Sequence, residues 1–261
     1  MQTKSITTFD FESNIWQVHA HPTLAILLVE TRNADTRTVQ FSAVDIIKNE
    51  VLWNTLNLGD DWWRSFETMT NTYLVLHGFE DAHNPVSSGV YVFDLISGKN
   101  VYANDNTIFV TLDGDLLIEK LSIENDEVYS QVNLLTGQKS TISVPSIISA
   151  TGENRILIPS YIEAEESSFN KIEVFINRYH SNEKVLSIEY LETQAHIAVA
   201  WIQQEENQLN HYIMLVDSLG NLVFKELIAE NMKGKSPGAF LVAHHTIAFV
   251  KDSTALWYYP L

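Results

Sequence analysis

The chain has 261 residues, of which 45% are hydrophobic, and it contains no cysteine. Its 33 acidic residues outnumber 16 lysines and arginines, which leaves a formal net charge of −17 and a field that repels nucleic acids and anionic membranes. The lack of cysteine excludes disulfides, thiolate metal sites and a cysteine nucleophile, and the length predicts one domain over residues 1–261.

The first residues, MQTKSITTFDFESNIWQ, contain no apolar segment of the kind that a signal peptide requires. Apolar runs elsewhere, such as LAILLV at residues 24–29, are far shorter than the ~20 residues of a membrane-spanning helix. We therefore expect a cytoplasmic protein whose partners include neither nucleic acid nor membrane.

Short runs rich in Val, Ile, Tyr, Phe and Thr, bounded by Gly, Asn, Asp or Pro, follow one another along the chain and predict an all-β protein. Residues 90–105, VYVFDLISGKNVYAND, are typical of a hairpin in which a glycine adopts the left-handed conformation of a tight turn. The same pattern recurs at spacings of 38 to 49 residues, with Gly or Asn in the turn. The five turn residues are Asn49, Gly98, Gly137, Asn182 and Gly220.

A second series of turns, each followed by an apolar strand, runs in step with the hairpins at spacings of 39 to 52 residues. This period predicts a β-propeller of six four-stranded blades, with five or seven blades as alternatives and a β-sandwich pair or irregular barrel as the competing topology. The six segments are HPTLAILLVE, TNTYLVLHGF, DGDLLIEKL, GENRILIPSY, TQAHIAVAW and HHTIAFVKD.

The sixth unit has a turn at His244 and His245, one strand in TIAFV and another in ALWYYPL, and lacks a fourth strand. Residues 4–11, KSITTFDF, have the composition of a strand. We predict that they complete the last blade and close the ring, so that no sheet edge stays open.

The hairpins FDLISGKNVY, VNLLTGQKST and VDSLGNLVFK resemble the blade hairpins of PQQ-type and WD-like repeat propellers. The resemblance implies a propeller over nearly the whole chain. The chain also resembles small uncharacterised bacterial families of propeller-like proteins of unknown function. No unit carries the WD dipeptide with its paired Gly-His, and the Trp-Gly docking pattern of quinoprotein blades is absent. The resemblance therefore implies no quinone, and we predict no cofactor.

A long connection, LNLGDDWWRSF at residues 56–66, supplies the first candidate site. Two adjacent tryptophans cannot both point to one face of a strand, so one of them is expected at the surface beside carboxylates. An exposed aromatic ring in such company holds sugars or cationic groups, whereas the alternative is that both rings pack between blades. The predicted ligand-binding residues are Asp60, Asp61, Trp62, Trp63 and Arg64.

Four histidines supply the second candidate site. His19 and His21 alternate on WQVHAHPT, and His244 with His245 occupies the corresponding turn of the sixth unit. If the ring closes, two to four imidazoles converge and suit Zn, Cu, Ni or Fe. The alternative is that HPT is turn chemistry and that the histidines are structural.

Phosphate loops, dinucleotide fingerprints and HExxH motifs are absent from the sequence. GKSPG at residues 234–238 matches the letters GxSxG, but it lies in a basic connection and not at the strand-to-helix turn of a nucleophile elbow. We therefore favour a non-catalytic binding or scaffold module that uses its acidic loop face to hold a protein, peptide or small-molecule ligand. A metal-dependent or acid/base hydrolase or lyase with its site at the central channel is the alternative, and assembly through the C-terminal LWYYPL is a third. The basic connection NMKGKSPG, residues 231–238, is expected to be a lid or an inter-blade linker.

Overall fold

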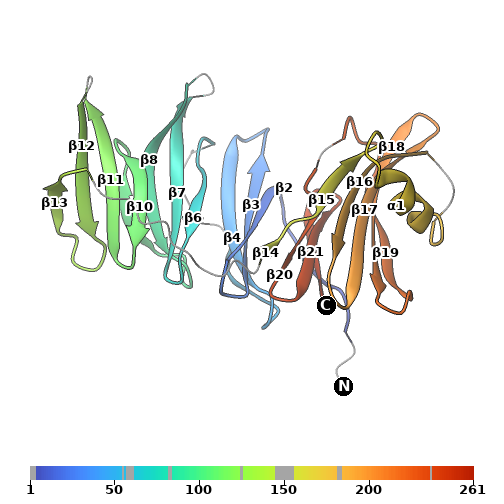
Figure 1. Cartoon of the computed structure of the whole chain (residues 1–261). Coiled ribbons are helices and arrows are strands. Elements are labelled where there is room, and N and C mark those ends of the chain that lie inside the picture. The colour runs from blue at the N-terminus through green and yellow to red at the C-terminus, as the bar shows by residue number, and fades with distance from the viewer. Residues whose placement is uncertain are drawn as a thin grey trace. The chain divides into compact units, whose positions relative to one another are not determined.

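The computed structural model describes residues 4–54, 56, 62–81, 84–123, 126–144, 156–180, 184–235 and 237–261. The described chain is almost entirely antiparallel β-sheet, as predicted (Figure 1). It divides into two compact units, Trp16–Asn154 and a second unit that combines Met1–Ile15 with Arg155–Leu261. None of the described helical residues forms a segment long and apolar enough to cross a membrane.

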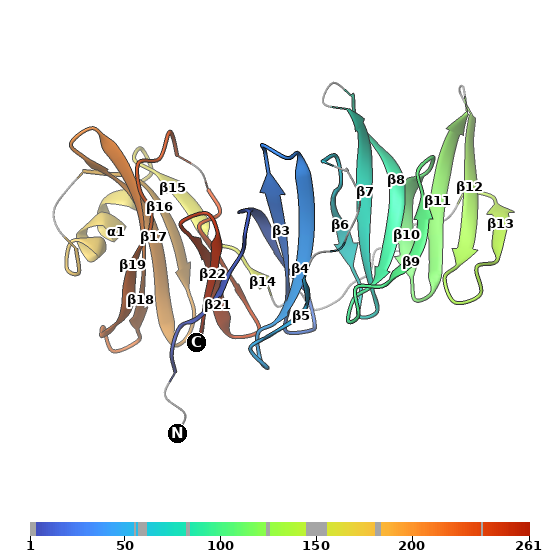
Figure 2. The same ribbon diagram turned by 180° about the vertical axis from the view of Figure 1, so that it is seen from behind.

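The unit Trp16–Asn154 contains three four-stranded sheets in which each strand pairs with its neighbour in sequence (Figure 2). The first sheet comprises β2 (Asn14–Ala20), β3 (Ile26–Asn33), β4 (Thr38–Asp45) and β5 (Glu50–Asn54). The second comprises β6 (Ser65–Met69), β7 (Tyr73–Asp81), β8 (Asn84–Asp94) and β9 (Asn100–Asn104). The third comprises β10 (Ile108–Asp113), β11 (Leu116–Ile123), β12 (Asp126–Asn133) and β13 (Lys139–Ile142).

The middle sheet of this unit is buried on both faces, which explains the continuous apolar run in β7. Leu74 and Leu76 pack into the core shared with the first sheet. Tyr73 and Val75 point the opposite way, into the core shared with the third sheet. Because side chains alternate along a strand, sheets stacked face to face require apolar residues at consecutive positions. Blade-like stacking thus follows directly from the sequence pattern.

The second unit contains two five-stranded sheets. One is a meander of β15 (Ser160–Glu163), β16 (Lys184–Glu192), β17 (His196–Glu205), β18 (Gln208–Asp217) and β19 (Leu222–Ala229). The other has the order β1 (Thr7–Asp10), β22 (Ala255–Pro260), β21 (Thr246–Lys251), β20 (Phe240–Ala243) and β14 (Ile156–Leu157). The pairing of β1 with β22 confirms that the N-terminal segment completes the last sheet.

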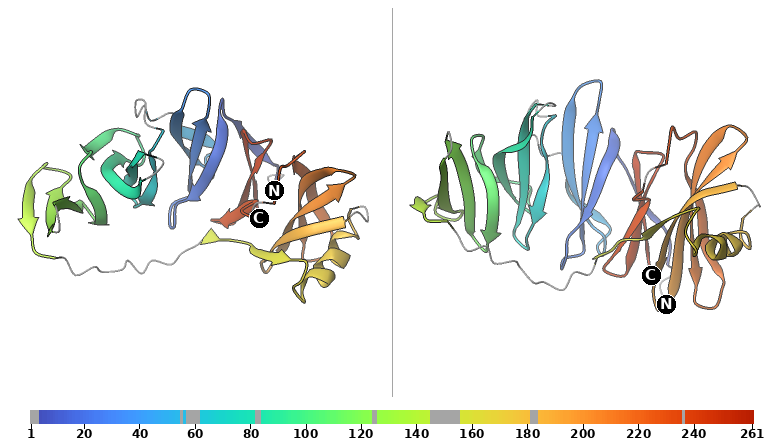
Figure 3. Two further views of the ribbon diagram at one scale, coloured as in Figure 1. Left: turned by 90° about the horizontal axis from the view of Figure 1, so that it is seen from above. Right: turned by 45° about the horizontal axis from the view of Figure 1, so that its top comes forward.

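The first strand of the hairpin predicted around Asn182 is wrong, because that segment begins within helix α1 (Phe169–Ile176). The second strand is present as β16, and the turn at Asn182 lies outside the described residues. Phe169, Ile172 and Ile176 recur at helical spacing and pack with β16 to β18. Figure 3 shows this helix, in yellow, beside the orange strands of its sheet. The described residues form five sheets, so the predicted count of six blades is not confirmed and the closed ring stays a prediction.

The other four predicted hairpin turns are confirmed. Their turn residues all have positive φ, namely Asn49 (55°), Gly98 (66°), Gly137 (72°) and Gly220 (85°). Each turn begins with an Asp or Asn whose side-chain oxygen accepts a backbone N–H from within the turn, a bond that replaces part of the strand ladder. These bonds run from Ile47 to Asp45 (3.0 Å), from Ser97 to Asp94 (2.7 Å), from Leu135 to Asn133 (3.1 Å) and from Leu219 to Asp217 (2.9 Å).

Candidate ligand-binding site

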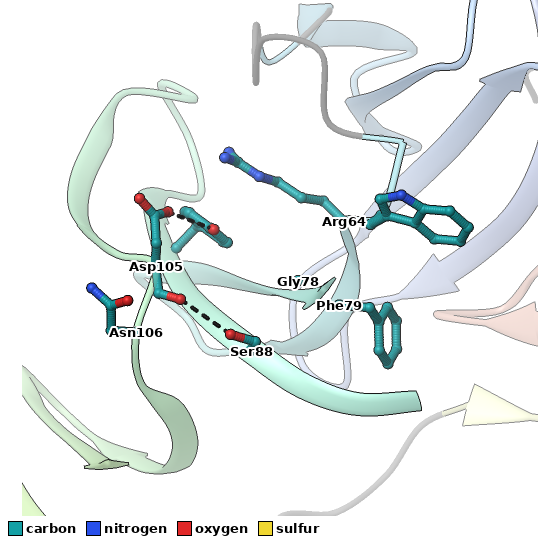
Figure 4. Close-up of a pocket in the computed structure, with 8 residues that line it drawn as sticks. Arg64, Gly78, Phe79, Ser88, Asp105 and Asn106 are labelled. Carbon is teal, nitrogen blue, oxygen red and sulfur yellow. Dashed lines mark hydrogen bonds between the residues drawn. The ribbon is translucent and has the colours of Figure 1, made fainter. Parts of the chain in front are cut away.

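A surface pocket of about 390 Å³ opens in the unit Trp16–Asn154, between the start of β6, the strands β7 and β8, and the turn that follows β9 (Figure 4). Aromatic, charged and amide side chains share its wall, a mixture typical of sites that recognise polar ligands with a flat apolar face. The lining residues are Trp63, Arg64, Gly78, Phe79, Ser88, Tyr91, Asp105 and Asn106.

The polar wall of the pocket is organised around Tyr91. The guanidinium carbon of Arg64 lies 3.7 Å from the centre of the Tyr91 ring, within the range of a cation–π contact. The Tyr91 hydroxyl donates a hydrogen bond of 2.7 Å to Oδ1 of Asp105, and the Ser88 hydroxyl donates one of 3.1 Å to the Asp105 backbone oxygen. Figure 4 shows the Arg64 side chain extending toward Asp105. A cation and an anion thus face the same cavity.

Two glycines allow close approaches in this wall, Gly89 that of the Tyr91 side chain and Gly78 that of the Ser88 backbone. A Cβ on Gly89, which has φ of +86°, would lie 2.5 Å from the Tyr91 hydroxyl oxygen. A Cβ on Gly78 would lie 2.6 Å from the backbone oxygen of Ser88. Neither distance is sterically possible without a shift, so this wall requires glycine at both positions.

Arg32 holds the segment that carries Trp63 and Arg64. From β3, it donates hydrogen bonds of 2.8 Å to the backbone oxygen of Trp62 and of 2.9 Å to that of Arg64. Its guanidinium also bonds Glu30, 2.7 Å away and fully buried on the same face of the strand. Burial raises the pKa of Glu30, while the Arg32 charge and the backbone N–H of Phe66 oppose that rise. The planar fork of arginine suits this bidentate contact with two carbonyl groups.

The turn that carries Asp105 and Asn106 is anchored in a comparable way by Glu119, a fully buried residue of β11. One carboxylate oxygen of Glu119 accepts a hydrogen bond of 3.1 Å from the Asn104 amide, and the other accepts one of 2.6 Å from the Thr107 hydroxyl. Asn104 and Thr107 lie on either side of Asp105 and Asn106, so these hydrogen bonds limit the movement of the turn.

The structure places the predicted ligand-binding residues unevenly. Trp63 and Arg64 line the pocket, and Trp63 is 38% exposed. Trp62 is half-buried, with its ring centre 5.1 Å from the Arg32 guanidinium. Asp60 and Asp61 lie outside the described residues. One tryptophan therefore faces the pocket and the other packs against the arginine that fixes the segment.

The histidines predicted near the N-terminus have structural surroundings. Nδ1 of His21 accepts backbone N–H groups from Thr23 and Leu24 at 3.1 and 2.8 Å, which is the turn role offered as the alternative for the HPT segment. His19 stacks on Phe66 with ring centres 4.0 Å apart, and burial lowers its pKa to about 4. Within the described ranges, no group of three or more metal-ligating side chains is arranged to hold a metal ion.

The two C-terminal histidines form the turn between β20 and β21. Both have left-handed backbone conformations, with φ of 50° for His244 and 57° for His245, and the flanking residues Ala243 and Thr246 are paired. These are the conformations of a two-residue hairpin loop, which favours Asn or Gly over histidine. The convergence of these residues with His19 and His21 on a metal stays a prediction.

Sequence reasoning missed Tyr91, Ser88, Asp105 and Asn106. The first two look like ordinary strand residues, and the last two look like a turn. The available signal was the pair of glycines, because Gly78 and Gly89 interrupt two apolar strands and a glycine inside a strand marks the close approach of another group.

Comparisons with known proteins place part of the chain in context. Residues 20–102 match the pattern of a domain of unknown function, DUF4905. No curated protein matches the sequence well enough to count as a relative. Solved structures similar to the chain include β-propeller proteins, at low identity and low TM-score.

The β-propeller domain of the Trilobed protease from Pyrococcus furiosus is 11% identical, with 92% of this chain and 79% of that chain covered and a TM-score of 0.34. An uncharacterized protein from Listeria monocytogenes is 10% identical, with 94% of each chain covered and a TM-score of 0.36. BamB from Moraxella catarrhalis is 13% identical, with 91% of this chain covered and a TM-score of 0.27. The chain spans 56% of the length of that BamB.

Proposed function

We propose that the protein is a non-catalytic binding module of propeller type, and that it captures its ligand in the pocket beside Trp63 and Arg64. The observation that carries this proposal is the partial exposure of Trp63 at a pocket whose lining segments are anchored by Arg32 and Glu119. Trp63 offers an apolar ring face, Arg64 offers donors, and Asp105 offers acceptors. A peptide segment or a sugar-like small molecule combines the flat face and the polar groups that this set would bind.

The hydrogen bonds inside the pocket support recognition rather than reaction. The Ser88 hydroxyl donates its proton to the backbone oxygen of Asp105, which is too weak a base to activate a nucleophile, and the Tyr91 hydroxyl is held by the Asp105 carboxylate as part of the wall. A wall whose polar groups are already bonded to one another is rigid, and a rigid site loses little entropy when it binds. The binding energy is therefore expected to come from contact with Trp63 and from hydrogen bonds to groups that are already fixed.

The proposal is tested by probing an array of immobilised peptides and oligosaccharides with the purified protein, followed by affinity measurements on any spot that retains it. Trp63→Ala should weaken binding by tenfold or more, because aromatic anchors dominate binding energy, and Trp63→Phe should weaken it less. The matched control is Ile47→Ala, which removes an exposed apolar side chain of the same unit outside the pocket. Binding that survives Trp63→Ala in a folded protein would contradict the proposal.

Arg32→Lys gives a second test, because Arg32 supports the site without lining the pocket. Lysine keeps the charge beside Glu30 but lacks the planar fork that bonds two carbonyl oxygens, so the segment at 62–64 should loosen. We expect a severalfold loss of affinity for the same array hits. An unchanged affinity would show that Arg32 does not position the site.

A further inference from the structure

A second cavity, of about 240 Å³, lies in the other compact unit, where the strands β18, β19 and β21 and the connection from β19 to β20 surround it. Polar and apolar atoms share its surface almost equally, and Ile228, Met232 and Val250 supply apolar side chains. It shares no lining residue with the pocket beside Trp63. An inference about this cavity is therefore independent of the function proposed above.

One polar side chain stands out in this wall. His211 is 7% exposed and lines the cavity from β18. The next residue in the strand, Tyr212, packs into the core on the helix side of the sheet, so the His211 side chain faces the opposite side. No described residue gives its imidazole a hydrogen bond or an ion pair, and burial lowers its pKa to about 4. The imidazole is reachable from the cavity and not sealed in the core, so a polar group of a ligand can hydrogen-bond it there.

The wall carries no formal charge at neutral pH. No Asp, Glu, Lys or Arg lines the cavity, and a buried imidazole that is neutral at pH 7 has one N–H donor and one bare nitrogen acceptor. An ionised ligand would lose its hydration here without gaining an opposite charge. An uncharged molecule with one polar group has no such penalty.

The far side of the cavity is fixed in place. The backbone N–H groups of Gly238 and Ala239 donate to Oε2 of Glu189 at 3.1 and 3.0 Å, and Glu189 is itself buried. At the other end of the connection, the N–H of Met232 donates to the backbone oxygen of Leu209 at 2.9 Å. The described residues of this basic connection, 231–235 and 237–238, are thus tied at both ends.

We propose that this cavity binds a small uncharged organic molecule, with its apolar body against Ile228, Met232 and Val250 and a single hydroxyl group hydrogen-bonded to His211. The cavity volume of about 240 Å³ sets the size. An apolar cavity of about 150 Å³ accommodates benzene, so a substituted six-membered ring fits here. Phenols and cyclic alcohols are the ligand class that combines this size with one hydroxyl.

The test uses 4-fluorophenol as the probe, with fluorobenzene and 4-fluorobenzoate as analogues that lack the hydroxyl or carry a charge. Binding is followed by ¹⁹F NMR and by the methyl signals of ¹³C-labelled methionine. Of the four methionines, Met232 lines the cavity, whereas Met69 and Met214 are buried elsewhere and serve as internal references. We expect 4-fluorophenol to shift the Met232 signal alone and 4-fluorobenzoate to bind at least tenfold more weakly.

His211→Phe should weaken 4-fluorophenol binding about tenfold and leave fluorobenzene binding unchanged, because only the hydrogen bond is removed. Ala239→Leu, which adds volume at the wall, should weaken both ligands and serves as the second variant if His211→Phe fails to fold. Trp63→Ala should change neither, which separates this inference from the proposed function. Equal affinity of wild type and His211→Phe for 4-fluorophenol, a preference for the benzoate, or no shift of Met232 would overturn the inference.

Discussion

Buried glutamates have the same role at three places in the molecule. Glu30 acts through Arg32 on the segment at 62–64, and Glu119 bonds the residues that flank Asp105 and Asn106. Glu189 bonds the backbone of the connection that borders the second cavity. A buried carboxylate is costly unless it is paired or hydrogen-bonded. Glu189 bonds a connection directly, Glu119 bonds the two residues on either side of a turn, and Glu30 acts through the strand residue Arg32. Charged core residues therefore fix the segments that form the cavities.

Burial of neutral histidine makes a pH-dependent prediction. The pKa of His19 is about 4 in the folded chain and about 6.5 when the chain is unfolded. Below pH 6.5 the His19 imidazole binds a proton in the unfolded chain but stays neutral in the folded chain. The free energy of unfolding therefore falls as the pH drops from 6.5 to 4. This shift of a largely buried group corresponds to about 3 kcal/mol at most. The contribution is constant above pH 6.5 and lost below pH 4.

Urea unfolding of wild type and His19→Phe at pH 7.0, 5.5 and 4.5 measures this contribution. Phenylalanine can keep the stack on Phe66 but cannot bind a proton, so the variant should gain stability relative to wild type as the pH falls. Other titrating groups are common to both proteins and cancel in the difference. A difference that stays constant with pH would show that His19 has an ordinary pKa.

How much of the site could be predicted from sequence depends on the kind of residue. Trp63 and Arg64, which line the pocket, could be singled out because two adjacent tryptophans beside charges in a long connection cannot both point to one face. Tyr91 and Asp105 could not be found, because their role depends on the pairing of β8 with β9 and on the approach of Arg64 from the segment before β6. Contacts of that kind depend on how strands are placed, which local patterns do not encode.

At the scale of the element, three of the four confirmed hairpins place one apolar side chain inside and the next outside. Leu95 is fully buried, and the following Ile96 is 51% exposed. The same position is exposed in three other hairpins, with 73% for Ile47, 73% for Leu135 and 85% for Leu219. The Asp or Asn at the start of each turn fixes this alternation. Its side chain accepts a hydrogen bond from the turn backbone, and the turn conformation that results decides which side chain points into the core.

The two positions should therefore respond differently to substitution. Leu95→Ala removes side-chain volume from the core between the first two sheets and should cost about 2–5 kcal/mol. Ile96→Ser changes an exposed tip and should alter the free energy of unfolding by less than about 0.5 kcal/mol. Urea titrations at pH 7 measure both. A large loss for Ile96→Ser would mean that the tip is packed against something in solution.

The hairpin repeat can be predicted from the sequence because each hairpin contains its own turn residues. Helix α1 cannot, because its local composition favours a different conformation. EVFINRY contains the β-formers Val, Phe, Ile and Tyr, so its composition favours a strand. The helical spacing of Phe169, Ile172 and Ile176 extends beyond that window and outweighs it once these side chains cover the face of β16 to β18. Packing against an already formed sheet decides between the two conformations.

At the scale of the whole molecule, charge is the dominant feature. A net charge of −17 at pH 7 makes the compact state repel itself more than the expanded unfolded chain does. Salt shortens the range of this repulsion, from about 30 Å at 0.01 M to about 8 Å at 0.15 M. Raising sodium chloride from 0.01 to 0.3 M at pH 7 should therefore increase the melting temperature, and a gain of about 1 kcal/mol corresponds to about 2–4 °C for a chain of this size.

The control is the same comparison near pH 4.8, the isoelectric point of the sequence, where the net charge approaches zero and the salt effect should largely vanish. Differential scanning calorimetry at both pH values and both salt concentrations gives the four melting temperatures that are needed. Stabilisation of equal size at the two pH values would show that salt acts through burial of apolar surface rather than through charge. A lower melting temperature in high salt at pH 7 would instead show that ion pairs such as Lys139 with Glu119 outweigh the general repulsion.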